Sequence, residues 1–269
     1  MRRVAIHPGA IGRMCAKVAV LPFGIPGFRR RGDLLILAYH RVGSGKGEIE
    51  LSPHVFERHL AFLAEHEGRR LRSLDDALSE GGGTVVTFDD GYRDFADVVV
   101  PLLVRYRIPA LLYLATGLIA NGGSTTASPD TALTWPMLEE AVATGLVSVG
   151  SHTHGHTSLA RSEEEEASSE MRRSKDLIED HLQVGCRHFS YPWGVGSAGA
   201  DRAARRIFDT AALDGWRTNR RGHMDVHRLG RTPVLRSDGM MFFKAKTLGL
   251  LDSEAMLYRA FGRGPWGKM

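Results

Sequence analysis

The sequence contains few cysteines and no long apolar segment. Cys15 and Cys186 are too few for a disulfide-rich scaffold, although they neither require nor exclude an oxidising compartment. No stretch reaches the roughly 18 consecutive apolar residues of a membrane-spanning helix. Hydrophobic residues make up 43% and charged residues 25% of the 269 residues, which is ordinary for a globular chain. A disordered protein, a coiled coil and a collagen-like fibre are therefore excluded.

Acidic residues are absent from residues 1–32, which form a basic N-terminal arm. The whole chain carries +4 and the arm +7, which leaves −3 for the rest. The arm is either a solvated tail or a segment that contacts an anionic membrane surface. Since no convincing secretory signal is present, a cytoplasmic or membrane-peripheral location is favoured. The basic residues are not interleaved with aromatic ones, so we expect no nucleic-acid partner.

Short apolar runs alternate about seven times with helical patterns, which predicts a parallel sheet of the α/β class. The expected strands are 34–39, 84–88, 110–115, 146–149, 189–191, 210–213 and 232–235. The expected helices are 53–67, 94–106 (kinked or divided at Pro101), 135–144, 163–181 and 200–208. Residues 121–131 are rich in turn-forming residues and are expected to form an exposed loop. We see no internal repeat or linker, and α/β barrels commonly use about 250 residues as one domain.

Residues that could carry chemistry follow the ends of the expected strands. They are His40, Asp89, Asp90, His152, His154, His156, Tyr191, Pro192, Trp193, Gly194 and Asp214. In a parallel barrel these strand ends converge on one face, where active sites lie. Residues that are distant in sequence would then meet in space.

Asp89 and Asp90 are adjacent carboxylates, which repel each other and need a reason to share a strand end. A bound cation is one reason, and a division of labour between a metal ligand and a general base is another. For the pair taken alone, capping of a helix N-terminus is the better explanation, since Asp is favoured there and Gly91 permits the turn.

His152 and His156 are spaced i, i+4 in the segment SHTHGH (151–156). On a helical turn this spacing places both imidazoles on one side, as in paired zinc ligands, whereas His154 points away. Together with one Asp they make a two-histidine, one-carboxylate site. Zinc hydrolases and non-haem iron oxygenases both use such a set, so its chemistry alone does not choose between them.

Three segments resemble the first three motifs of the NodB-type polysaccharide deacetylases, also called carbohydrate esterase family four. They are TFDDGY (87–92), SHTHGH (151–156) and FSYPWG (189–194). AYHRV (38–42) and RSLDDAL (72–78) resemble the branch that deacetylates exopolysaccharide. The resemblance covers roughly residues 33–250 and implies a distorted (β/α) barrel with about seven parallel strands. A single domain over 33–269 is expected after the arm.

The resemblance also implies roles for individual residues. Asp90, His152 and His156 would hold a divalent metal, usually Zn²⁺, with Co²⁺ as an alternative. Asp89 would be the general base. Tyr191, Pro192, Trp193 and Gly194 would contact the substrate, with the Trp193 backbone N–H facing the oxyanion.

The sequence departs from the family pattern at three motifs. Many members have an Arg directly after the Phe of the third motif, where this chain has Ser190; the nearest Arg is Arg187. The fourth motif is represented only by Asp214 and Trp216. For the general acid, His227 in a rearranged fifth motif and His40 at the end of the first strand both remain candidates.

The leading hypothesis is a metal-dependent hydrolase that removes N-acetyl groups from an N-acetylglucosamine-containing polysaccharide or glycoconjugate. A metal-dependent amidohydrolase acting on a small amide or cyclic ureide is an alternative with the same fold. A non-catalytic glycan-binding module is a third, although such a module has no need of both a base and metal ligands. An iron oxygenase fits least well, since its ligands normally sit on an antiparallel double-stranded helix.

Overall fold

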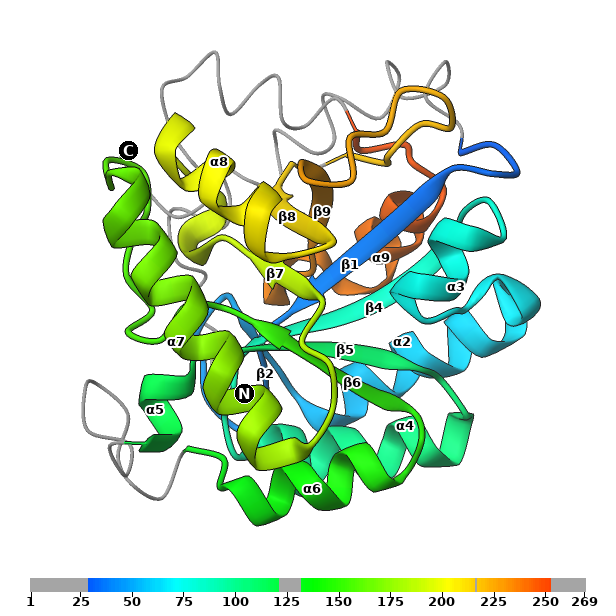
Figure 1. Cartoon of the computed structure of the whole chain (residues 1–269). Helices are drawn as coiled ribbons and strands as arrows, with labels where there is room; N and C mark the ends of the chain where they lie inside the picture. Colours follow the sequence, from blue (N-terminus) through cyan, green and yellow to red (C-terminus); the bar gives the residue numbers. More distant parts are fainter. Residues whose placement is uncertain (1–28, 121–131, 216, 253–269) are drawn as a thin grey trace.

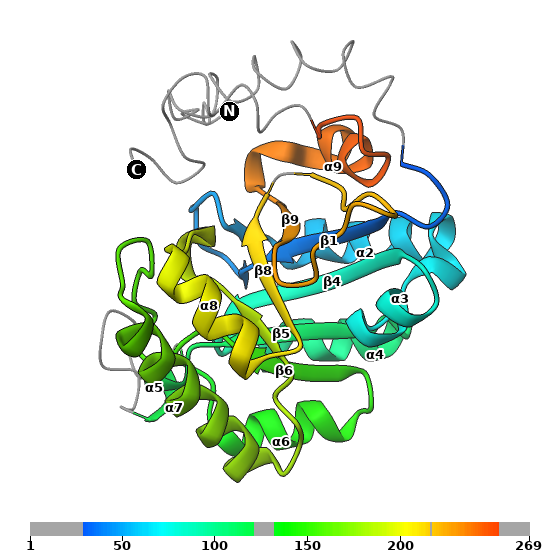
Figure 2. The same ribbon diagram turned by 45° about the horizontal axis from the view of Figure 1, so that its top comes forward.

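The computed structural model describes residues 29–120, 132–215 and 217–252. In this part of the chain, seven parallel strands close into a barrel (Figures 1 and 2). Around the barrel they are β1 (Leu34–Tyr39), β4 (Gly83–Asp90), β5 (Ala110–Leu114), β6 (Val147–Ser151), β7 (His188–Ser190), β8 (Thr210–Asp214) and β9 (Leu229–Pro233). The pairing of Leu37 with Thr232 closes β9 onto β1. The predicted single-domain barrel is confirmed, with β9 beginning three residues earlier than expected.

Helices surround the strands (Figures 1 and 2). They are α2 (Pro53–His66), α3 (Leu74–Ser79), α4 (Val100–Tyr106), α5 (Thr116–Ala120), α6 (Trp135–Ala143), α7 (Glu164–Leu182), α8 (Ala198–Ile207) and α9 (Gly239–Thr247). The smaller elements are the strand pair β2 (Arg41–Val42) and β3 (Glu50–Leu51), and 3₁₀ turns at Gly68–Arg70, Pro192–Gly194 and Arg236–Asp238. The helix predicted over 94–106 is divided, as its proline suggested. A π-helical segment, Phe95–Val99, leads into α4, and Pro101 lies in the first turn of α4, where its missing N–H costs little.

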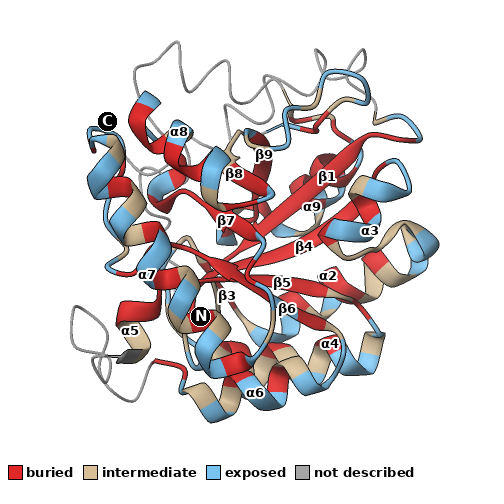
Figure 3. Ribbon diagram, viewed as in Figure 1, coloured by how far each residue is buried: buried red, intermediate tan, exposed pale blue. Residues whose placement is uncertain are grey.

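Alternate residues of each strand face the barrel interior and the helices, since the side-chain period of a strand is two. On β4, Val85 packs with apolar side chains of the other strands inside the barrel. Val86 and Phe88 instead join the large core between the strands and the helices. Figure 3 shows the strands buried on both faces. This alternation places Asp89 inside the barrel, at its carboxyl end.

Some predicted features lie outside the described residues. They are residues 1–28 of the basic arm, the loop at 121–131 and Trp216. Within the described ranges, no helix is both long and apolar enough to cross a membrane.

Candidate metal centre and active site

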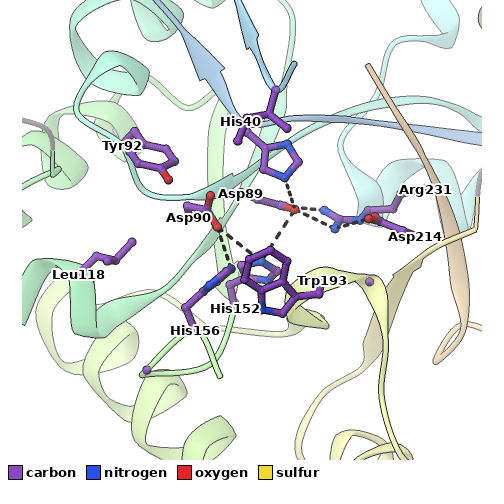
Figure 4. A pocket seen from close by; sticks show the side chains of 13 residues that line it. His40, Asp89, Asp90, Tyr92, Leu118, His152, His156, Trp193, Asp214 and Arg231 are labelled. Atoms are coloured by element: carbon purple, nitrogen blue, oxygen red, sulfur yellow. Dashed lines mark hydrogen bonds and ion pairs between the residues drawn. The ribbon is translucent and has the colours of Figure 1, made fainter. Parts of the chain in front are cut away.

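A pocket opens at the carboxyl ends of the barrel strands (Figure 4). Its volume is about 380 Å³. It is lined by His40, Ile49, Asp89, Asp90, Tyr92, Leu118, His152, Gly155, His156, Trp193, Gly194, Asp214 and Arg231. The expectation that residues far apart in sequence meet on one face is therefore met.

The three predicted metal ligands lie together at one side of this pocket. One donor atom from each of Asp90, His152 and His156 lies within 4.8 Å of the others. The Oδ1 atom of Asp90 is 3.1 Å from Nε2 of His156 and 3.8 Å from Nε2 of His152. A tetrahedral zinc ion, with ligands at about 2.0–2.2 Å, separates its donor atoms by roughly 3–3.6 Å. The Asp90–His156 distance lies in this range and the Asp90–His152 distance just above it, so a small inward shift of His152 would let the three side chains hold a small divalent ion.

The orientation of His152 also suits a metal ligand. Its Nδ1 donates a hydrogen bond to the backbone carbonyl of Ser190 at 2.8 Å, which leaves the lone pair of Nε2 directed at Asp90. Burial lowers the pKa of His152 to about 4, so the ring is neutral near pH 7, the form that binds metals.

Asp90 is held in its ionised form. Burial alone would raise its pKa, but a hydrogen bond from His156 and the electrostatic influence of His40 and His156 hold that pKa well below its usual range. The hydroxyl of Tyr92 also hydrogen-bonds to Asp90, and burial raises the pKa of Tyr92 to about 12, so that this hydroxyl keeps its proton. The carboxylates of Asp89 and Asp90 therefore face the pocket rather than capping a helix.

The predicted helical turn at residues 152–156 is wrong. Thr153 (φ +65°) and His156 (φ +51°) are left-handed, which a right-handed helix does not allow. The loop still brings the rings of His152 and His156 together, with centroids 5.1 Å apart. His154 points away, as expected, with Nδ1 3.0 Å from Oγ1 of Thr116.

Arg231 is a site residue that the sequence analysis missed. It is buried in the barrel and donates to both carboxylate oxygens of Asp89, at 2.5 and 2.8 Å, and to Asp214 at 3.3 Å. Burial alone would raise the pKa of Asp89, but Arg231 and the neighbouring histidines hold it below its ordinary value. The sequence offered no local signal for it, because Arg231 stands directly before the expected strand 232–235, at the end of a polar and basic stretch.

Arg187, the arginine nearest in sequence to the third motif, lies elsewhere. Its side chain is 56% exposed and pairs with Asp209 at 2.6 Å and Asp75 at 3.3 Å. The family pattern expects an Arg at position 190 to contact the predicted base. In this chain Arg231, on β9, makes that contact with Asp89.

The two candidate general acids are placed differently. His40 lines the pocket, with Nε2 3.8 Å from Oδ2 of Asp89. His227 is not among the pocket residues, and its Nε2 donates to the backbone carbonyl of Phe208 at 2.9 Å. The pocket therefore contains His40 and not His227.

The four predicted substrate contacts also divide. Trp193 is 54% exposed at the pocket wall, and Gly194 lies beside it. Pro192 is buried and does not line the pocket. Tyr191 is only 1% exposed and packs edge-on against Phe189, because it points outward from the end of β7 into the helix-side core. Tyr191 and Pro192 thus lack the predicted contact surface, whereas Trp193 and Gly194 have it.

Comparison with known proteins finds a family match to part of the chain. The family model for polysaccharide deacetylase matches residues 80–208, a segment that contains the two aspartates, the histidine loop and Trp193. The match agrees with the closed parallel barrel and with the Asp–His–His cluster at its carboxyl end. This part of the chain is therefore similar to the polysaccharide deacetylases, which agrees with the resemblance of the three sequence motifs.

Two curated relatives are similar to the chain over about the same share of its length. The chain is 28% identical over 169 residues to YxkH of Bacillus subtilis (strain 168), which is named as a polysaccharide deacetylase, and the match covers 60% of this chain. It is 26% identical over 194 residues to the poly-β-1,6-N-acetyl-D-glucosamine N-deacetylase of Staphylococcus epidermidis, over 61% of this chain. The matches span 57% and 66% of these relatives, less than two thirds of either length.

Solved structures show the same fold. IcaB from Ammonifex degensii superimposes with a TM-score of 0.68 at 24% identity, covering 81% of this chain and 97% of that one. The Streptococcus pyogenes deacetylase PplD, solved in complex with acetate, gives 0.67 at 21% identity, covering 81% and 98%.

Proposed function

We propose that this protein is a divalent-metal-dependent hydrolase that removes N-acetyl groups from an N-acetylglucosamine-containing polysaccharide or glycoconjugate. The observation that carries the proposal is the convergence of Asp90, His152 and His156 beside a second buried aspartate, Asp89, in one open pocket. Zn²⁺ is the proposed ion, since nitrogen and carboxylate ligands in this number are typical of catalytic zinc. A divalent ion bound there supplies a Lewis acid that polarises the amide carbonyl and lowers the pKa of a water molecule.

Asp89 is the proposed general base. Its Oδ2 lies 3.9 Å from Nε2 of His152, so it faces the space beside the proposed metal ligands. Arg231 holds both carboxylate oxygens, which fixes the plane of the group and favours its ionised form at neutral pH. Asp89 can therefore accept a proton from the attacking water without first reorienting.

His40 is the proposed general acid. It approaches the same carboxylate oxygen of Asp89 from the β1 side of the pocket, opposite His152 in Figure 4. A proton donor at this position can deliver its proton to the leaving amine while Asp89 takes one from water. The location of His227 outside the pocket favours His40 for this role.

The proposed substrate is a glycan because an exposed aromatic ring, that of Trp193, stands at the wall of the pocket. Trp193 presents a half-exposed ring 5.4 Å from the His156 ring, and flat aromatic rings suit the apolar faces of sugars. The name of the S. epidermidis relative gives a specific model substrate, a β-1,6-linked polymer of N-acetylglucosamine. The backbone N–H of Trp193 is the proposed oxyanion donor.

Acetate release from N-acetylglucosamine oligomers, measured with zinc, with cobalt and with chelator, tests the proposal. Asp89→Asn should retain stoichiometric metal and lose turnover by about 10²- to 10⁴-fold. His156→Ala should instead lose metal, and His227→Ala is the control that should change neither. Full turnover by Asp89→Asn would exclude its role as the base. Metal binding without acetate release would point to the small-amide alternative, and glycan binding without hydrolysis to a binding module.

A further inference from the structure

The loop that carries both histidine ligands has a strained backbone. Thr153 and His156 both have left-handed φ angles, which cost roughly 1–3 kcal/mol each in residues other than glycine. Such a conformation persists only where neighbouring groups fix it. The contacts that fix this loop therefore determine whether the side chain of His156 meets Asp90.

One set of contacts comes from α5. The backbone N–H of Gly117 donates to the carbonyl of His154 at 2.7 Å, and Oγ1 of Thr116 contacts Nδ1 of His154 at 3.0 Å. These bonds hold the middle of the loop on the side away from the pocket. His154 thus has a structural task that explains a third histidine between the two ligands.

The second set comes from α7. The side chain of Glu170 accepts a hydrogen bond from the backbone N–H of Gly155, with Oε2 2.7 Å from the nitrogen. Gly155 is the residue directly before His156 and lines the pocket itself. The helix is anchored by buried Ala167, Met171 and Ser174, so the carboxylate is presented from a rigid element. A bond between a charged acceptor and a backbone donor is stronger than a neutral one.

We propose that Glu170 is a positioning residue for the metal site, which holds the Gly155 peptide so that His156 faces Asp90 and His152. This inference rests on the proposed metal-dependent function. Glu170 does not line the pocket, and its hydrogen bond reaches the site through the backbone of the loop. Groups that hydrogen-bond a metal ligand directly typically contribute 10- to 100-fold to metal affinity, and we expect a contribution of this order from Glu170 through the peptide next to the ligand.

Zinc affinity, measured by competition with a chromophoric chelator on metal-free protein, tests the role of Glu170. Glu170→Ala should weaken zinc binding by about 10- to 100-fold and alter the visible spectrum of the Co²⁺-loaded protein. Glu170→Gln keeps an acceptor oxygen and should stay within a few fold of wild type. Glu166→Ala, at an exposed position one turn earlier on α7, is the matched control and should leave both readouts unchanged.

The design separates this inference from the proposed function. Wild-type zinc affinity and an unaltered cobalt spectrum in Glu170→Ala would overturn the role of Glu170 while leaving the metal site intact. Failure of the wild-type protein to bind zinc or cobalt would overturn the metal site, and this inference with it. Glu170→Asp retains the charge but retracts the acceptor by one methylene. It should also weaken binding, and it decides the question if the alanine variant fails to fold.

Discussion

Replacement of Arg231 is expected to affect both stability and turnover. The side chain is 1% exposed and makes two hydrogen bonds to Asp89 and one to Asp214. Arg231→Met leaves two buried carboxylates without their cation, and breaking a buried ion pair in this way costs about 3–5 kcal/mol. In a domain of this size, each kcal/mol of destabilisation lowers the melting temperature by about 2–4 °C, so we expect a fall of about 6–20 °C.

Turnover should fall as well, because the carboxylate of Asp89 is no longer fixed. A displacement of about 1 Å can cost about 100-fold, so we expect at least that loss in kcat/KM for acetate release. Arg231→Lys keeps the charge without the two-pronged geometry, and should recover more stability than activity.

Arg228→Met is the matched control for these measurements. Its guanidinium is 53% exposed and pairs with Asp201 at 3.3 Å, so a change below about 1 kcal/mol is expected. A melting temperature of Arg231→Met within about 2 °C of wild type would refute the stability argument. Wild-type kcat/KM in Arg231→Lys would show that charge, and not the geometry of the guanidinium, is what Asp89 requires.

Three further predictions concern other parts of the chain. His40→Gln should reduce kcat by about 10²- to 10⁴-fold in steady-state acetate release, whereas a comparable loss in His227→Gln would reverse the assignment of the acid. Burial lowers the pKa of His59 to about 4, so between this value and about 6.5 the folded state binds fewer protons than the unfolded state. The contribution of neutral His59 to stability is therefore fully present above about pH 6.5 and is lost as the pH falls towards 4. Between pH 7 and pH 5, the free energy of unfolding measured in urea should therefore fall by about 2 kcal/mol less in His59→Gln than in wild type. An equal fall in the two proteins would contradict this explanation. A Cβ on Gly194 (φ +68°) would lie 2.3 Å from Cβ of Asp214, so Gly194→Ala should destabilise the protein by about 1–3 kcal/mol and raise KM. Gly222 is also left-handed (φ +82°) but faces open space, so Gly222→Ala should destabilise the protein less in thermal unfolding.

The barrel could be predicted from sequence because its strands are short, apolar and separated by helical periodicity. Leu34–Tyr39 was predicted with the bounds that the structure shows. The convergence of Asp89, Asp90 and the histidines followed from the direction of parallel strands alone. These features depend on local patterns, which sequence displays directly.

The partner of Asp89 could not be predicted in the same way. Arg231 is 142 residues away, and the two meet because β9 closes the barrel against β1. No local pattern gives the rotational position of the last strand, on which the direction of the Arg231 side chain depends. Tyr191 was misplaced for a related reason. Its neighbours suggested a turn at the pocket, but the strand alternation directs its ring outward.

The histidine spacing predicted that His152 and His156 lie together, which the structure shows, but it predicted the wrong backbone conformation for them. Asp90 (φ +76°), His156 (φ +51°) and Trp193 (φ +60°) all have backbone angles that favour glycine. Each nevertheless carries a side chain that faces the pocket. Local propensity therefore argues against the observed backbone at the positions that the proposed chemistry needs. Contacts from elsewhere in the fold, such as the bond between Gly155 and Glu170, must offset that cost. Conflict between local preference and tertiary structure is concentrated where sites are built, so sequence reasoning placed these side chains at one pocket but predicted the wrong backbone for the histidine loop.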